Sequence, residues 1–92
     1  MNGILSKEQE HCCEEIVLCK SVARVGKESV TYRLSVGVHA HAKSFLVYVE
    51  MSGEEASVSM GDDLERAVVF YRQILDGLVT PCTLDEIFED FE

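Results

Sequence analysis

The sequence of 92 residues has no tryptophan, only one proline and no long apolar run. Its unbroken apolar runs, such as Phe45–Val49, are far shorter than the roughly 20 residues that a membrane-spanning helix needs. No basic stretch followed by an apolar one marks the N-terminus, so we expect no secretory signal peptide. With 47% hydrophobic and 27% charged residues, the composition is that of a folded domain and excludes a disordered tail. These features predict a small cytoplasmic domain.

Net charge is missing from the first half of the chain. Basic and acidic residues balance over residues 1–51, and the whole net charge of −9 lies in residues 52–92. An acidic half repels phosphate groups, so we expect no binding to nucleic acid or to a membrane surface. A basic protein partner would be attracted, although the same charge could serve only to keep a small domain soluble.

The four cysteines form no recognised motif. They are Cys12, Cys13, Cys19 and Cys82, and no two of them have the Cys-x-x-Cys spacing of zinc sites and redox pairs. Without a secretory signal, an even number of cysteines does not indicate a disulfide framework. We therefore expect reduced and partly buried thiols.

From Cys13 to Met60 apolar and polar residues alternate, as they do in half-buried strands. Three turn signals, at residues 26–29, 41–44 and 52–55, divide this stretch into four strands. Centring the strands on these turns pairs Val25 with Val30, Ala40 with Phe45, and Met51 with Ala56. All three hairpins then place their apolar residues on one face of an antiparallel sheet.

The period changes after Met60 to that of two amphipathic helices. The first carries an apolar stripe, with Asp62 as its predicted N-cap and Gly77 as its stop. The stripe comprises Leu64, Ala67, Val68, Tyr71, Ile74, Leu75 and Leu78. After Pro81, the Thr83-x-x-Glu86 pattern begins a short helix whose apolar stripe is Leu84, Ile87, Phe88 and Phe91.

The sequence therefore predicts an α+β fold, a four-stranded antiparallel meander followed by two helices packed on one sheet face. Residues 13–92 would form this one domain, and residues 1–12 a flexible N-terminus. The expected buried core includes Val36, Val38, Val47, Val49, Tyr71 and Leu75.

Two groups of residues could form a site on the predicted sheet. The predicted register places His41 opposite Glu14, so a metal site using Cys12, Glu14, His39 and His41 is geometrically conceivable. Its spacing matches no established metal-binding pattern, and a polar strand face normally explains such histidines. We expect no bound cofactor and no catalytic residues, since phosphate loops, nucleophile elbows and zinc-binding helix motifs are absent from the sequence.

The second group is apolar and lies on the outer face of the predicted sheet. Ile16, Leu18, Leu46 and Tyr48 would cluster there and form an interface. The alternatives are that the N-terminal segment with Ile4 and Leu5 covers them, or that they are scattered surface residues. Val69 and Phe70 fall off the helix stripe and could extend a contact surface, although Phe70 could instead simply flank the core.

The C-terminal third resembles a family of small bacterial proteins of unknown function. The shared features are a charged helix ending in Asp76-Gly77, then Pro81, a Leu84-Asp85-Glu86-Ile87 segment, and a closing Glu89-Asp90-Phe91. Upstream, Val30-Thr31-Tyr32-Arg33-Leu34 is similar to a tyrosine-containing strand of those proteins. The resemblance implies the same order of elements and a bacterial cytoplasmic setting, and it implies no activity.

Two functional hypotheses follow. The first is a small acidic, non-enzymatic protein-interaction module that forms a homodimer, binds a basic partner, or does both. The second is a metal- or thiol-responsive regulator that uses Cys12, Cys13, Cys19, His39 and His41.

Overall fold

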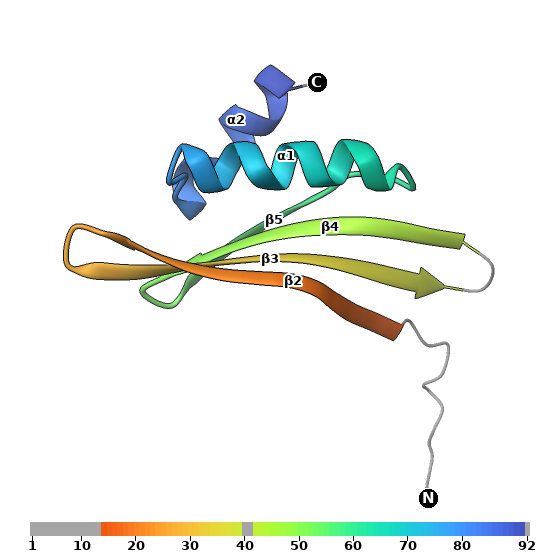
Figure 1. The fold of residues 1–92 in the computed structure, drawn as a ribbon, viewed down its shortest axis with the longest axis horizontal. Helices are drawn as coiled ribbons and strands as arrows, with labels where there is room; N and C mark the ends of the chain where they lie inside the picture. The colour runs from red at the N-terminus through yellow and green to blue at the C-terminus, as the bar shows by residue number, and fades with distance from the viewer. Residues whose placement is uncertain (1–13, 40–41, 92) are drawn as a thin grey trace, which may run out of the picture.

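A computed structural model describes residues 14–39 and 42–91 of the chain. The elements are β2 (Glu14–Val25), β3 (Glu28–His39), β4 (Ala42–Met51), β5 (Glu54–Ser59), α1 (Leu64–Asp76), the 3-10 turn η2 (Pro81–Thr83) and α2 (Leu84–Phe91). The strands form one antiparallel sheet in the order β2-β3-β4-β5, and both helices lie on the same face of it (Figure 1). The predicted α+β meander followed by two helices is confirmed.

The hairpins are tighter than the predicted four-residue turns, so the predicted register is wrong. Ala23 is paired with Val30, Val36 with Phe45, and Val49 with Ala56. Between β4 and β5 the turn has only Ser52 and Gly53, both at positive φ (55° and 83°), as two-residue hairpin loops of type I′ require. Each correction shifts the pairing by an even number of residues, so the same side chains still face the helices.

One irregularity in β2 does change which face of the sheet the side chains occupy. The β2–β3 pairing shifts between Val17 and Cys19, where Leu18 is an extra residue in β2 and forms a β-bulge. Beyond the bulge Ile16 is opposite Val36, on the helix side of the sheet, and Val17 is opposite Ser35, on the outer side. The bulge therefore exchanges the faces of the N-terminal residues of β2.

The core lies between the sheet and α1. Val30, Tyr32, Leu34, Val47 and Val49 are buried beneath the helices. Their partners on α1 are Ala67, Phe70, Tyr71 and Ile74. Two tyrosines fasten the layers together: Tyr32 donates a 2.9 Å hydrogen bond to the carbonyl of Val79, and the hydroxyl of Tyr71 lies 3.2 Å from the carbonyl of Tyr32.

The ends of α1 differ slightly from the prediction. Asp63, and not Asp62, is the N-cap, and its carboxylate accepts a 3.1 Å hydrogen bond from the backbone N–H of Arg66. Gly77 ends the helix as predicted, but it keeps a helical φ of −88°. The following Leu78 takes the left-handed conformation instead, with φ at +50°. An exposed leucine therefore occupies the position at which a glycine would be unstrained.

The predicted core is correct for Val47, Val49 and Tyr71, whereas Val36 and Leu75 are only partly buried. The prediction that Val38 is buried is wrong, because 38% of its surface is exposed. The tighter hairpin pairs it with Lys43, near the end of the sheet. Of the two alternatives for Phe70, the structure shows the core position: Phe70 is fully buried, because α2 packs against that side of α1.

Candidate protein-interaction surface

The helices leave one edge of the sheet uncovered. α1 packs over β3 and β4, while η2 and α2 pack on β5, the far edge strand. β2 therefore keeps both faces largely in solvent, and most of its residues are exposed. Three large apolar side chains on it have more than half of their surface exposed, namely Ile16 (53%), Val17 and Val22 (62%).

The side of α1 that faces β2 is also apolar and incompletely covered. At 100° per residue, Leu64, Val68 and Leu75 lie on one flank of the helix, and Phe70 and Arg66 lie on the other. The second flank is occupied by α2, since the Phe70 ring packs edge to face against Phe88 and at a tilt against Phe91, with ring centroids 5.6 and 5.0 Å apart. On the first flank, Leu64 is 48% exposed, and Val68 and Leu75 are half-buried.

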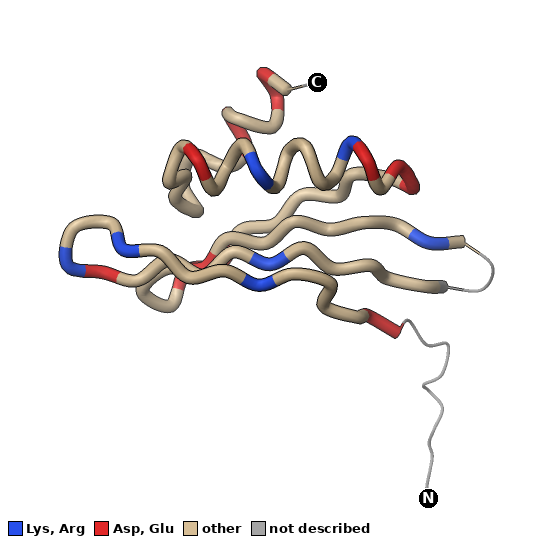
Figure 2. Tube along the Cα trace, viewed as in Figure 1, with Lys and Arg blue, Asp and Glu red and all other residues tan. Residues whose placement is uncertain are grey.

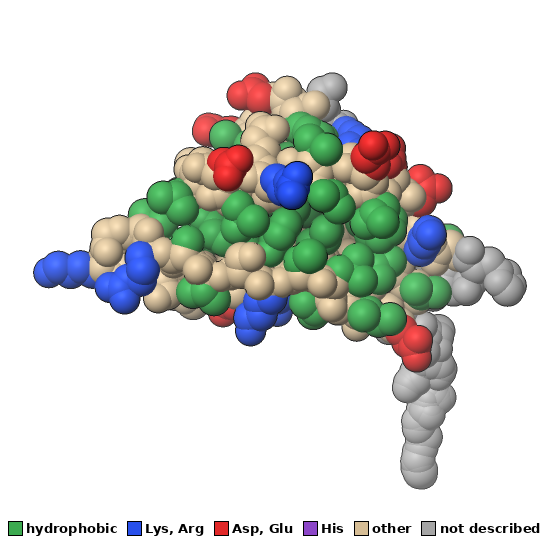
Figure 3. Space-filling model, in the orientation of Figure 1, with side chains coloured by type: hydrophobic (Ala, Val, Ile, Leu, Met, Phe, Trp, Pro, Cys, Tyr) green, Lys and Arg blue, Asp and Glu red, His purple; other side chains and the backbone are tan. Residues whose placement is uncertain are grey.

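These two sets of residues meet across the side of the molecule that β2 borders. A continuous apolar band runs between α1 and the strand beneath it on this side (Figure 3). We call this surface the open side and define it by the residues that carry it: Ile16, Cys19, Val36, Leu64, Val68 and Leu75. It is the lateral margin of the core itself, so partner side chains placed here would contact core residues directly.

A hydrogen-bonded group formed by Tyr71, Ser21 and the carbonyl of Tyr32 lies within the open side. The hydroxyl of Tyr71 lies 3.2 Å from both the Ser21 hydroxyl and the Tyr32 carbonyl. Because a carbonyl can only accept, Tyr71 donates to it and Ser21 donates to Tyr71. Burial raises the pKa of Tyr71, and the hydrogen bond from Ser21 works against that rise. The Tyr71 hydroxyl therefore stays neutral at physiological pH and links α1 to β2 through Ser21 and to β3 through Tyr32.

The two edge strands differ in their protection. β5 has only six residues, begins with Glu54 and Glu55, and packs against η2 and α2. β2 has twelve residues and runs free along its outer edge within the described part of the chain. Long edge strands with apolar side chains are ready to pair with another strand, and natural proteins usually shorten, charge or cover them. The bulge at Leu18 interrupts β2 near one end and leaves Cys19–Val25 regular.

Charge along β2 is polarised. Glu14 and Glu15 stand at its N-terminal end, and Lys20 and Arg24 lie in its C-terminal half. Figure 2 shows acidic residues at the N-terminal end of β2 and separate basic residues in its C-terminal half. Among the described residues, the ion pair that the sheet forms joins Arg33 of β3 to Glu55 of β5 and involves no charge of β2.

The structure places only two of the four predicted interface residues in paired positions on the outer face. Leu46 and Tyr48 do share the outer face of β4, and both are half-buried. The prediction that Ile16 lies on the outer face is wrong, because the bulge turns its side chain to the helix side. Leu18 is the unpaired bulge residue, and 45% of its surface is exposed. The four side chains therefore do not form the predicted rows.

The outer face is also more polar than predicted. The guanidinium of Arg33 lies 4.6 Å from the centre of the Tyr48 ring, and the same guanidinium pairs with Glu55. Burial, followed by a hydrogen bond to Glu15 and its negative charge, raises the pKa of Tyr48 to about 12. A charged network thus covers the ring that was expected to anchor an apolar contact.

The metal and thiol candidates receive no geometric support. Glu14 is opposite Val38 and not His41, His39 is opposite Ala42, and Cys12, Cys13 and His41 lie outside the described residues. Within residues 14–39 and 42–91, no group of three or more His, Cys, Asp or Glu side chains is arranged to hold a metal ion. Cys19 and Cys82 are free thiols as predicted, but both are exposed rather than partly buried.

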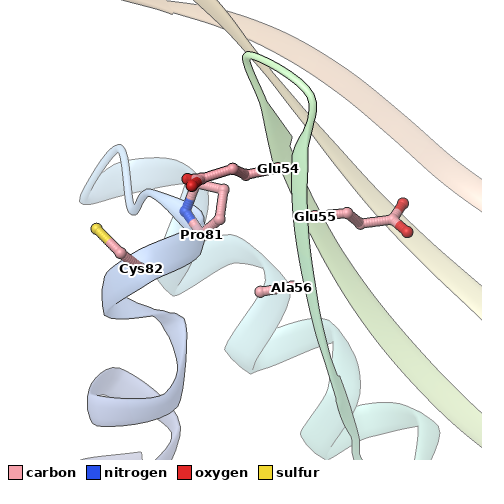
Figure 4. A pocket seen from close by; sticks show the side chains of 5 residues that line it. All are labelled: Glu54, Glu55, Ala56, Pro81 and Cys82. Carbon is pink, nitrogen blue, oxygen red and sulfur yellow. The ribbon is translucent and has the colours of Figure 1, made fainter.

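A shallow hollow lies between the start of β5 and η2. Glu54, Ala56, Pro81 and Cys82 border it, and Glu55 belongs to the same stretch of β5. In Figure 4 Glu54 extends toward Pro81, whereas Glu55 points away on the other side of the strand. One exposed carboxylate and one exposed thiol with no base between them do not form an arrangement for nucleophilic catalysis.

Sequence reasoning missed the open side because it assigned Leu64, Val68 and Leu75 to the core stripe of the helix. The available signal was the run Ile16-Val17-Leu18, which is apolar on both faces of one strand.

None of the described helices is long and apolar enough to cross a membrane. The resemblance to small bacterial proteins stays a prediction. Comparison of the chain with family models, with curated proteins and with solved structures finds no match in any of the three.

Proposed function

We propose that this protein is a non-enzymatic protein-interaction module that associates with a second copy of itself through the open side. The observation that carries the proposal is the margin of the core between β2 and α1, which no other part of residues 14–39 and 42–91 covers. Ile16 and Leu64 are about half exposed there, beside half-buried Val68. Monomeric proteins rarely leave contiguous apolar surface of this kind in water, because burying it is favourable. A covering partner would remove that surface from solvent.

The acidic residues of α2 lie on the opposite flank of α1 from the open side. The carboxylates of α2 (Asp85, Glu86, Glu89 and Asp90) are exposed on the layer above the sheet. Binding of a basic partner to them stays a prediction, as does regulation by a metal or by thiol chemistry.

The test compares two glutamate substitutions on the same helix. Leu64 and Val69 are exposed to nearly the same degree, 48% and 51%, but they lie about 140° apart around α1. Light scattering across a concentration series should give wild type the mass of two chains. Leu64→Glu should weaken the dimer, because it places a charge on the open side, and Val69→Glu should leave it unchanged. A wild-type protein that stays monomeric at the highest soluble concentration would overturn the proposal, as would equal effects of the two variants.

A further inference from the structure

We infer that the two copies join edge to edge through antiparallel β2 strands, so that their sheets form one continuous sheet around a two-fold axis. This inference rests on the proposed self-association and specifies its geometry. A two-fold contact uses the same surface on both copies, and a free strand edge is suited to that purpose since each backbone can donate to and accept from the other.

The orientation follows from the charges of β2. In a parallel contact, Glu14 and Glu15 of one copy would face the same residues of the other. In an antiparallel contact the acidic end of each strand lies against the basic half of its counterpart, which carries Lys20 and Arg24. Complementary charges favour correct pairing and like charges oppose the wrong one. β2 is therefore complementary to itself in only one direction.

The charges select the register. Leu18 is an extra residue, so each strand changes faces at this point, and a two-fold axis places the two bulges symmetrically and keeps the faces matched in more than one register. Placing Cys19 opposite Cys19 keeps the faces matched and also brings the acidic end of each strand against the basic half of the other. Ser21 then faces Ile16 of the second copy on the helix side, and Val22 faces Glu15 of the second copy on the outer side.

This register also pairs the charges and brings Ile16 of each copy beside the open side of the other. On the outer face, Glu15 of the second copy lies diagonally between Lys20 and Arg24, which flank Val22 in β2. On the helix side, Ile16 of the second copy lies beside Ser21, which is hydrogen-bonded to Tyr71 of α1. An exposed apolar side chain of each copy thus comes to lie under the margin of the other copy's core.

The first experiment reverses the charges of β2. Glu14→Lys with Glu15→Lys makes the strand basic, and Lys20→Glu with Arg24→Glu makes it acidic. Each variant alone should lose the dimer, with the dissociation constant raised at least about tenfold by like-charge contacts. An equimolar mixture should form a heterodimer. The matched control, Asp85→Lys with Glu86→Lys on α2, changes the net charge as much as the basic variant and should keep the wild-type mass.

The second experiment measures direction and register by disulfide trapping in the full chain. With Cys12, Cys13 and Cys82 changed to serine, the oxidant diamide should link two copies through Cys19, because directly opposed residues of antiparallel strands lie within disulfide reach. With Cys19 also changed to serine, Val22→Cys should not link to itself, but should link to Glu15→Cys when the two variants are mixed.

The outcomes separate this inference from the function on which it rests. A monomeric wild type would overturn both. A dimeric wild type whose charge variants do not recombine would overturn the edge-to-edge geometry and leave self-association standing. Self-linking of Val22→Cys would overturn the proposed register.

Discussion

Removal of the Phe70 side chain tests how the helix layer is held together. Phe70 is fully buried, and its ring contacts those of Phe88 and Phe91. Truncation of a buried phenylalanine costs about 3–5 kcal/mol, and the two ring pairs place the expected loss for Phe70→Ala in the upper part of that range. A domain of this size has a stability near the lower end of about 5–15 kcal/mol, so this variant should be largely unfolded on mild heating.

A milder substitution keeps the measurement within range. Phe70→Leu retains most of the apolar volume but removes both ring pairs, which contribute about 0.5–1.5 kcal/mol each. The melting temperature should fall by roughly 4 °C or more for each kcal/mol lost. Val69→Ala is the control, because that neighbouring side chain is half exposed and should change the stability by less than about 0.5 kcal/mol. Thermal unfolding followed by circular dichroism checks the series. Equal melting temperatures for Val69→Ala and Phe70→Leu would refute the packing of α2 on this flank.

Two further predictions concern the tyrosines and the left-handed leucine. Burial is the main cause that raises the pKa of Tyr48 to about 12, and it also raises the pKa values of Tyr32 and Tyr71 above the ordinary 10.0. The folded chain therefore holds these three protons more tightly than the unfolded chain does. Its free energy of unfolding should fall as pH rises above about 10. Urea unfolding between about pH 9 and about pH 12, with phenolate absorbance recorded alongside, measures this, and a tyrosine that ionises near pH 10 in the folded protein would contradict it. Leu78→Gly should stabilise the chain by up to about 1 kcal/mol in denaturant titration, since glycine accepts the φ of +50° without strain, whereas a loss would mean that the exposed leucine makes a needed contact.

The alternation of side chains determined the architecture of the sheet but not its register. A shift of two or four residues keeps every side chain on its face, so the sequence pattern is the same for Ala40 paired with Phe45 and for the observed pairing of Val36 with Phe45. Only the closed hairpin, with its two-residue loop, selects among these registers. The bulge at Leu18 is the reverse case, because a shift of one residue changes faces, yet an extra residue in an apolar run leaves no mark in the pattern.

The amphipathic period likewise determined that two helices cover the sheet, and the apolar stripe of the second helix is confirmed. It could not determine which strands they cover. That depends on the contact of Phe70 with Phe88 and Phe91, which sets α1 over β3 and β4 with α2 toward β5 and leaves β2 uncovered. Helix periodicity records how apolar each flank is, but not which neighbour lies against it. For this reason Leu64 and Val68 read as core residues in the sequence, and only tertiary packing makes them part of the open side.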